Sequence, residues 1–477
     1  MNKTSLLATP VAVLLLAGCA SWDGIQSESR KIDADRLALE QSSQGIAKNA
    51  PWPTQDWWAG YQDRQLDQLI AEALKDSPTL KAAQARIRKA AAQAGLSRSQ
   101  LYPQVNASGS VTGERFTNNG LYPAPYAGNT RSDDRMSLDG SYDLDIWGGH
   151  EAEYRAALGG LHASEVEAQA ARLELETAIA QAYTRLATEY DQLDISRELL
   201  RQKQEIQGLS AKLSGAGLVT DIENQQAEAA IAAAQAEITA GEERIALLRQ
   251  TLAVLIGASP DRGTAIQRPA LHLNTAIGLP SALPAELIGR RPDIVARRWR
   301  IEAATHGIDA AKAEFYPNIN LKAFVGLQSI GLDQFLVAAS RTYGAGPAIT
   351  LPIFDAGRLR SNLAQDTASL DIEIEQYNGA VLSALQDIVA QLTSWQANQD
   401  ALAQERVAVA HLEQAYRLAV LRYREGLTNY LTVLSAEGEL IAQRRKVADS
   451  WNRQYALSIA LAHALGGGFA PQTVPNS

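Results

Sequence analysis

The segment NINLKAFVGLQ, residues 318–328, alternates apolar side chains with polar or small ones along its whole length. Successive side chains of a β-strand point to opposite faces, so this pattern predicts a strand with one apolar face. That face would carry Ile319, Leu321, Ala323, Val325 and Leu327. Most of the remaining chain is rich in Ala, Gln, Glu, Leu and Arg, which favour helices. We therefore expect the strand to be part of a sheet in a mainly helical protein.

Three other segments alternate in the same way, and we predict that they complete the sheet. They are residues 104–113, 137–146 and 343–354. Each is about ten residues long, which is the length of a tilted strand that crosses a membrane. The segment 137–146 places Asp139, Asp143 and Asp145 on its polar face, so we expect these carboxylates to face a water-filled lumen. A half-buried sheet in a soluble protein would show the same alternation.

The helical part of the sequence predicts long rods. Continuous helical patterns cover residues 150–214 and 357–424, and return helices follow at 219–256 and 428–465. Shorter helices are predicted at about 66–100 and 284–314, with Pro78 and Pro292 as helix starts or restarts. At 1.5 Å per residue, a helix of roughly 65 residues is about 100 Å long. Apolar side chains recur in both long helices at a 3.5-residue period, which favours a left-handed coiled coil. In the first helix these positions include Ile179, Tyr183, Leu186, Tyr190 and Leu193, and in the second Val381, Leu385, Ile388, Leu392 and Leu402.

The chain also contains a pattern that occurs twice. LYP at 101–103 returns as FYP at 315–317, and the sequence GAGLVTDIE at 215–223 has REGLTNYLT at 424–432 as its counterpart. Internal repeats of this kind indicate duplicated structural units. We therefore predict an internal two-fold repeat, with these boundaries: a signal peptide at 1–18, a linker at 19–65, a first repeat at 66–257, a linker at 258–283, a second repeat at 284–466 and a tail at 467–477. The glycines at 466–468 suggest a flexible C-terminal end.

The N-terminus has the features of a cleaved targeting segment. A basic Lys3 precedes a short apolar stretch and then LAGC at 16–19, which resembles a bacterial lipobox. That resemblance implies cleavage before Cys19 and covalent lipid on this residue, and Ala20 after it implies sorting to the outer membrane. Cys19 is the only cysteine, so no internal disulfide can form. An ordinary secretory signal with an incidental cysteine is the alternative.

Composition and motifs argue against several other classes of protein. The net charge of −9 gives no basic surface for nucleic acid. The six histidines are scattered, and the sequence has no P-loop, no nucleophile elbow and no dinucleotide fingerprint. We therefore expect no metal, no cofactor other than the lipid, and no enzymatic activity.

Four strands of one chain are too few to close a membrane barrel. Lipid tolerates no unpaired strand edge, and single-chain barrels begin at eight strands. Two chains would give a narrow barrel filled by side chains, whereas three chains would give twelve strands and an open lumen. We predict an α+β membrane protein: a trimeric 12-stranded β-barrel, continued by a long periplasmic α-helical coiled-coil barrel.

Four features together resemble those of the TolC/OprM-type outer-membrane factors. They are LAGC, the LYP and FYP junctions, the duplicated layout, and YREGLTNYLTVLSAE at 423–437. The resemblance is narrower still to their NodT-like lipoprotein branch. It implies a homotrimeric channel that serves as the exit duct of a tripartite efflux system. The implied partners are a periplasmic membrane-fusion adaptor and an inner-membrane transporter of the RND type.

The resemblance also assigns roles to residues near the two helical turns. Gly217, Leu218, Gly426 and Leu427 would contact the adaptor. Family members often carry acidic residues after the second turn, but this chain has Thr432 and Ser435 at those positions. Asp221 after the first turn could supply the charge of a periplasmic gate instead, although an acidic residue there also suits the helix dipole. Tyr430 is a candidate for closing the pore sterically.

Two other functions remain open from the sequence. The first is a periplasmic coiled-coil adaptor or scaffold lipoprotein that never spans the bilayer. The second is the outer-membrane component of a type I secretion system. The four alternating segments favour a channel, because a scaffold has no use for rows of lipid-facing side chains.

Overall fold

The computed structural model describes residues 21–33, 37, 50–217, 220–273 and 283–470. The chain divides into two compact units, and each unit takes segments from both predicted repeats. The sheet unit comprises Met1–Lys31, Arg86–Ser164 and Ala296–Tyr377, and the helical unit comprises Ile32–Ala85, Glu165–Val295 and Asn378–Ser477. The predicted signal peptide and Cys19 lie outside the described residues.

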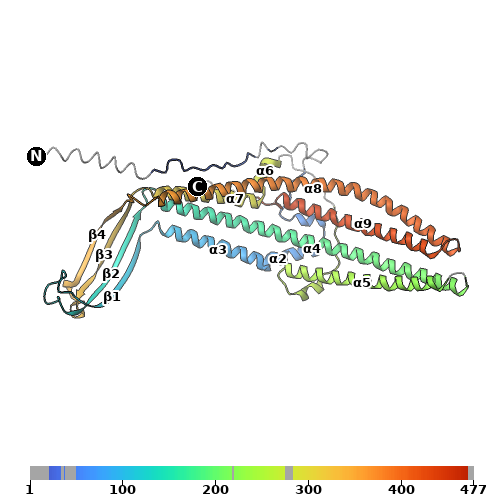
Figure 1. Cartoon of the computed structure of the whole chain (residues 1–477), viewed down its shortest axis with the longest axis horizontal. Coiled ribbons are helices and arrows are strands. Elements are labelled where there is room, and N and C mark those ends of the chain that lie inside the picture. Colours follow the sequence, from blue (N-terminus) through green and yellow to red (C-terminus); the bar gives the residue numbers. More distant parts are fainter. Residues whose placement is uncertain (1–20, 34–36, 38–49, 218–219, 274–282, 471–477) are drawn as a thin grey trace. The chain divides into compact units, whose positions relative to one another are not determined.

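The sheet unit contains one antiparallel sheet with the order β1-β2-β3-β4 (Figure 1). Its strands are β1 (Gln104–Arg115), β2 (Thr130–Leu144), β3 (Asn318–Ile330) and β4 (Arg341–Thr350). The apolar rows lie in register across all four strands: Ala107 pairs with Leu138, Leu138 with Val325, and Val325 with Tyr343. The prediction that the four alternating segments share one sheet is confirmed.

Two strand boundaries differ from the prediction by more than two residues. Strand β2 begins at Thr130 rather than at residue 137, because TRSDDRM continues the ladder to β1 without any apolar alternation that a sequence pattern could reveal. Strand β4 ends at Thr350 rather than at residue 354. Pro352 lies just beyond it, and a proline has no amide hydrogen for a ladder.

Each of the two shorter predicted helices is divided in two, and the second helix of each pair begins at a proline, where the sequence predicts a helix start or restart. The segment expected as one helix over 66–100 forms α2 (Arg64–Asp76) and α3 (Pro78–Ser99), and its counterpart forms α6 (Leu283–Arg290) and α7 (Pro292–Ala313). Proline suits the first position of a helix, since the amide hydrogen it lacks would have no partner there. Asp63 caps α2 by accepting the amide hydrogens of Gln65 and Leu66.

The long helices match the prediction closely. They are α4 (Gly149–Gly215) and α8 (Arg358–Arg424), of 67 residues each, and the return helices are α5 (Asp221–Leu255) and α9 (Tyr430–Ala464), of 35 residues each. In the helical unit α4 lies beside α5 and α8 beside α9, so each pair forms a hairpin (Figure 1). None of the described helices is both long enough and apolar enough to cross a membrane.

The core of the helical unit forms around the predicted heptad positions. Ile179, Tyr183 and Leu186 are completely buried, and they join Leu66 and Ile70 of α2 in one cluster. The Tyr183 hydroxyl donates a hydrogen bond to Asp63 Oδ2 at 2.9 Å, which satisfies the polar end of a buried ring. These apolar side chains therefore pack α2 against α4.

The glycines at 466–468 are not a flexible end. All three residues have positive φ, and a Cβ on Gly466 would collide with the backbone carbonyl of Arg290. A Cβ on Gly467 would collide with Leu173, and one on Gly468 with the backbone of Thr54. The prediction for this part of the tail is wrong, because glycine here allows close packing as well as freedom of the backbone.

Candidate functional site

The first helical turn joins α4 to α5 at Gly217. Gly217 has φ of +73° and donates its amide hydrogen to the carbonyl of Ser214 at 2.9 Å. A Cβ at this position would meet nothing within 4 Å, so the glycine is required by the backbone conformation and not by lack of space. Leu218, which we predicted as a contact beside it, lies outside the described residues.

The second turn joins α8 to α9 at Gly426, which has φ of +71°. The amide of Leu427 donates to the carbonyl of Arg422 at 2.8 Å, and that of Gly426 donates to the carbonyl of Tyr423 at 3.0 Å. These two bonds are the Schellman arrangement that ends a helix with a left-handed residue. The geometry explains both turn glycines without reference to a partner.

Large apolar side chains are exposed around both turns. Leu427 is 68% exposed, and Ile222 and Leu431 are 67% and 58% exposed. Ile222 and Leu431 are each the second residue of a return helix, α5 and α9 respectively. Exposed apolar residues that gather at one place mark a contact surface more reliably than scattered ones do. Ile222 and Leu431 were not predicted from the sequence, although their equivalent positions in the two predicted repeats could have revealed them.

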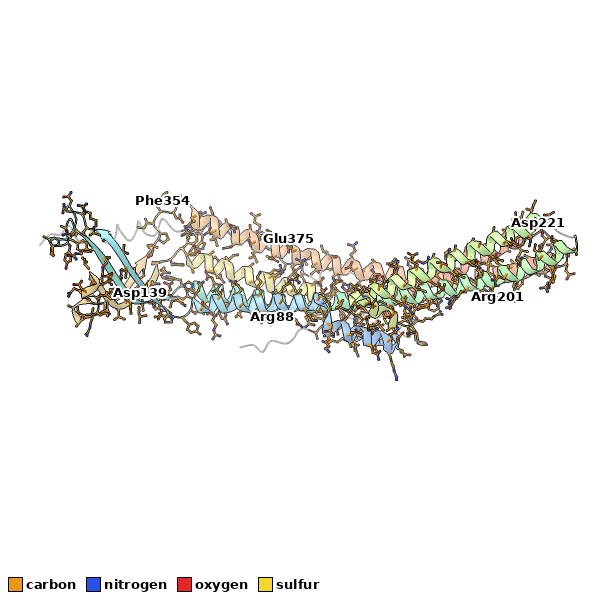
Figure 2. The ribbon with its side chains drawn as sticks, turned by 90° about the horizontal axis from the view of Figure 1, so that it is seen from below. Arg88, Asp139, Arg201, Asp221, Phe354 and Glu375 are labelled. Carbon is orange, nitrogen blue, oxygen red and sulfur yellow. The ribbon has the colours of Figure 1, made fainter. Side chains whose placement is uncertain are left out.

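The predicted gate residues lie in different environments. Asp221 is the first residue of α5 and is exposed at the end of the α4–α5 hairpin (Figure 2). Thr432 and Ser435 are exposed on α9, and the amide of Thr432 donates to Asn429 Oδ1 at 3.2 Å as part of the helix cap. Of these residues, Asp221 is the one that offers a charge to solvent.

Tyr430 is buried instead of exposed. Its side chain is 1% exposed, and its ring centroid lies 5.9 Å from that of Tyr423. Burial raises the pKa of the Tyr430 hydroxyl to about 12. In the described chain this ring packs between helices, which argues against its closing a pore directly.

A buried ion pair connects the two hairpins close to these tyrosines. Lys203 Nζ of α4 lies 2.7 Å from Glu437 Oε2 of α9, and the two side chains are 12% and 4% exposed. Burial raises the pKa of Glu437, and the hydrogen bond from Lys203 partly offsets this effect. This pair could not be predicted from the sequence, because its members lie 234 positions apart.

Two of the three predicted aspartates lie on the polar face of the sheet. Asp139, labelled in Figure 2, accepts hydrogen bonds from Ser137 at 2.7 Å and from Ser108 at 3.2 Å. Asp143 accepts one from the Asn320 side chain at 2.5 Å. Serine and asparagine surround the carboxylates, so this face is hydrophilic and can be wetted.

Asp145 is not part of strand β2. Strand β2 ends at Leu144, and the Asp145 carboxylate accepts the amide hydrogens of His150 and Glu151 at 3.0 and 2.8 Å. It caps the first turn of α4, which corrects its assignment to the lumen-facing strand. Asp355 caps α8 in the same way, and the amides of Leu359 and Gly357 lower its pKa.

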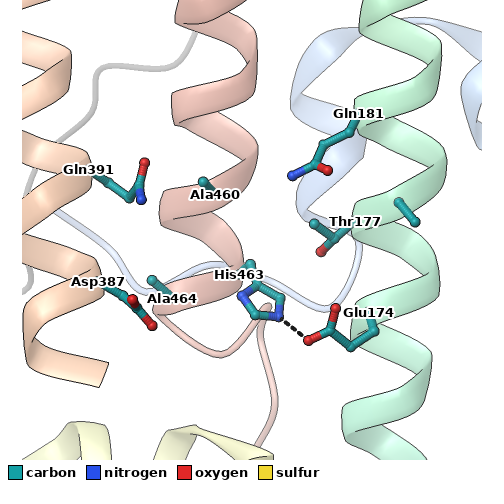
Figure 3. Close-up of a pocket in the computed structure, with 9 residues that line it drawn as sticks. Glu174, Thr177, Gln181, Asp387, Gln391, Ala460, His463 and Ala464 are labelled. Atoms are coloured by element: carbon teal, nitrogen blue, oxygen red, sulfur yellow. Dashed lines mark hydrogen bonds and ion pairs between the residues drawn. The ribbon is translucent and has the colours of Figure 1, made fainter. Parts of the chain in front are cut away.

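A polar cavity of about 300 Å³ lies between α4, α8 and α9 in the helical unit (Figure 3). His463 Nε2 lies 2.9 Å from Glu174 Oε1, and this hydrogen bond lowers the pKa of Glu174. Asp387, also in the wall, lies 3.6 Å from Arg291. Each acidic group thus faces a basic partner, as in a polar contact between helices. In the described ranges, no group of three or more His, Cys, Asp or Glu residues could hold a metal ion.

The geometry can now be compared with known proteins. A family model described as outer membrane efflux protein matches the chain twice, over residues 69–258 and 283–467. The fusaric acid resistance protein FusA of Burkholderia cepacia is 40% identical over 370 residues, which cover 77% of this chain and 70% of FusA. The multidrug resistance outer membrane protein MdtP of Escherichia coli K12 is 32% identical over 483 residues, which cover 98% of this chain and 97% of MdtP.

A solved structure agrees with these relatives. The crystal structure of the outer membrane protein VceC from Vibrio cholerae is similar to this chain with a TM-score of 0.81 and 37% sequence identity. The similarity covers 88% of this chain and 100% of VceC. The chain therefore belongs to the outer membrane efflux protein family.

Proposed function

We propose that this chain is the outer-membrane exit duct of a tripartite efflux system and conducts its substrates passively. The observation that carries the proposal is the sheet. Within the described residues, β1 pairs only with β2 and β4 only with β3, so both outer edges lack a partner. Apolar side chains on its strands are exposed, among them Val105 at 69%, Val325 at 57% and Ile349 at 67%. A membrane accounts for the exposed apolar rows, and neighbouring chains account for the open edges.

The number of chains follows from the cost of an open edge in lipid. Each unsatisfied backbone group in hydrocarbon costs several kcal/mol, so the sheet must close. Three copies supply twelve strands and an interior wide enough for a lumen, whereas eight strands leave an interior that side chains fill. The homotrimer is therefore our proposed assembly, with Asp139 and Asp143 facing its interior and the helices forming a periplasmic coiled-coil barrel.

We further propose that the chain carries an internal repeat and a lipid anchor. The equal lengths of α4 and α8 and of α5 and α9 support the repeat, as do the two matches to one family model. For the anchor, LAGC at 16–19 supports cleavage before Cys19 and acylation of its sulfur and amino group. The anchor would bind the chain to the outer membrane independently of the sheet.

The two turns are the proposed contact surface for a periplasmic adaptor. Exposed Leu427, Ile222 and Leu431 give that surface an apolar character, which suits a helical partner. An inner-membrane transporter of the RND type would supply the energy. FusA and MdtP are named for resistance to fusaric acid and to multiple drugs, so we propose small organic molecules as the cargo instead of proteins.

Reconstitution into a planar lipid bilayer tests this function. The wild-type trimer should give discrete single-channel currents, because its wet sheet interior offers an aqueous path. If a trimer-sized protein gives no conductance, the result would instead indicate a periplasmic scaffold, and the channel function would be rejected.

The same recordings test the proposed gate. Asp221→Ala should change the conductance or reduce the preference for cations, because three exposed carboxylates would be lost from the periplasmic end. Gln225→Ala, which changes an exposed uncharged side chain of the same helix, is the control. If Asp221→Ala gives currents identical to those of the wild type, Asp221 has no part in the gate.

A further inference from the structure

The first described residues form an extended strap on the sheet unit. Residues 21–31 contain no helix or strand, and from Ile25 to Arg30 partly buried and exposed residues alternate. Trp22 and Ile25 pack against a buried cluster of Ala311, Phe315, Leu359 and Leu363. The strap is therefore seated on α7 and α8 of its own unit through two apolar side chains.

Two charged residues of α8 hold the strap by its backbone. Arg360 donates hydrogen bonds to the carbonyls of Ser21 and Asp23. Asp371 accepts hydrogen bonds from the Ser27 hydroxyl at 2.5 Å and from the amide of Ser29 at 3.1 Å. The Ser27 hydrogen bond lowers the pKa of Asp371. Arg360 binds carbonyl oxygens of the strap, whereas Asp371 binds hydrogen-bond donors of the strap. The strap therefore has a defined direction along α8.

Trp22 lies at the end of the helices where the sheet begins. Its ring centroid is 5.4 Å from that of Phe315 and 5.8 Å from that of Tyr316, and both contacts are edge-to-face. Tyr316 in turn stacks on Trp147 with 4.4 Å between the ring centroids. Strand β3 begins two residues after Tyr316, at Asn318. The strap therefore ends in a row of aromatic rings at the junction of helix and strand.

An exposed aromatic residue is present at each of the four helix–strand junctions. We call this set the aromatic collar: Tyr102 before β1, Trp147 after β2, Tyr316 before β3 and Phe354 after β4. Their exposed fractions are 53%, 47%, 39% and 90%, respectively. Pairing of Gln104 with Ser141 and of Asn318 with Thr350 puts the four junctions at one end of the sheet. Phe354 is labelled in Figure 2. Tyrosine and tryptophan concentrate where a membrane meets water, so the collar marks the boundary of the bilayer.

We propose that Trp22 is a positioning residue that holds the strap on the collar, so that lipid on Cys19 enters the bilayer at the collar. Cys19 precedes Ser21 by two residues in the sequence. Arg360 fixes the Ser21 carbonyl. The docked strap thus limits where the lipid can enter the bilayer. This inference rests on the proposed lipidation of Cys19.

A nitroxide spin label at Ser21→Cys, in the full-length protein reconstituted into vesicles, tests the proposal. The Ser21 side chain is exposed, and its hydroxyl accepts one local hydrogen bond, from the amide of Asp23 at 3.1 Å. The label replaces that hydroxyl but leaves the hydrogen bond from Arg360 to the Ser21 carbonyl intact. With Trp22 present, the label should be immobilised and more accessible to oxygen than to a water-soluble nickel complex. In Trp22→Ala the spectrum should become mobile and the accessibility to nickel should rise severalfold, whereas Trp22→Phe should restore the wild-type spectrum.

Two controls keep the result decisive. Trp52→Ala removes a tryptophan that lies against Arg290 in the helical unit, and it should leave the label unchanged. Asp371→Asn, a change on an accessible helix surface that should not prevent folding, should release the strap partially. An unchanged spectrum in Trp22→Ala would overturn the proposal, whatever the result for Asp371→Asn.

The intact mass of the same protein separates this inference from the proposed lipidation. A mass that includes acyl groups on Cys19, together with an immobile label, supports both proposals. A mass without them rejects the lipidation, and with it the role of Trp22 in placing lipid, even if the strap remains docked.

Discussion

At the scale of single residues, glycine serves different purposes at different positions of this chain. Gly426 needs a positive φ but has open space around it, whereas Gly466 has a positive φ and also lies against the backbone of Arg290. Gly438, inside α9, has neither constraint. The sequence predicts a helical turn at Gly426, but it does not show that Gly466 packs against another part of the backbone.

Alanine substitutions at the three positions should therefore form a graded series. Gly438→Ala should stabilise the protein by up to about 1 kcal/mol, because alanine is the better helix former. Gly426→Ala should cost about 1 kcal/mol, the penalty for a left-handed residue with a Cβ. Gly466→Ala should cost more than Gly426→Ala, because a steric clash is added. Denaturant unfolding of the purified variants measures the order, and equal effects at positions 426 and 438 would contradict it.

Asp145 illustrates the difference between a cap and a pore residue. If it caps α4, Asp145→Asn should keep most of the stability, since asparagine is an equally good cap, whereas Asp145→Ala should cost about 1 kcal/mol. If it lined the lumen, both variants would alter the single-channel current equally, since both remove the charge. We expect thermal unfolding to show that Asp145→Asn is more stable than Asp145→Ala. We also expect Asp145→Asn and wild-type channels to carry the same current.

At the scale of elements, the two helical hairpins are joined near their ends by Lys203 and Glu437. A buried ion pair contributes little net stability, but removal of one partner leaves an uncompensated charge. A carboxyl group whose pKa is raised in the folded state binds its proton at a higher pH than in the unfolded state. The stability of the fold therefore increases as the pH falls through the raised pKa toward the ordinary value of 4.5, and decreases as the pH rises.

Lys203→Met should cost about 3 kcal/mol at pH 7 and clearly less at pH 5, where Glu437 without its partner is protonated more readily. The double variant Lys203→Met/Glu437→Leu should recover most of the loss. Arg201→Met, which breaks exposed ion pairs with Glu198 and Glu205, is the control and should have no measurable effect. Thermal unfolding at both pH values provides the comparison, and a loss at Lys203→Met that is independent of pH would refute the account.

The elements differ in how far the sequence predicted them. The helices and the four strands follow from apolar periodicity, because one face of each element is apolar. The first seven residues of β2 were missed, since TRSDDRM carries no such period. The Lys203–Glu437 pair and the capping role of Asp145 were missed for another reason: they depend on which helices and strands meet in space. Gly217 and Gly426 were found because a helical turn requires a residue that local sequence identifies.

At the scale of the whole molecule, the account depends on the open edges of one sheet. In the described chain β1 and β4 each have one neighbour, and rows of apolar side chains on the strands are exposed. No rearrangement of four strands closes a membrane barrel, and we therefore propose that another copy of the chain pairs with each edge. The proposals for the lumen and for the periplasmic barrel both assume this assembly.

The most direct test is the mass of the detergent-solubilised particle, measured by native mass spectrometry. We predict a single species with three times the mass of the mature chain, because only three copies give twelve strands around an open interior. A stable folded monomer, or a particle with two chains, would contradict the central claim.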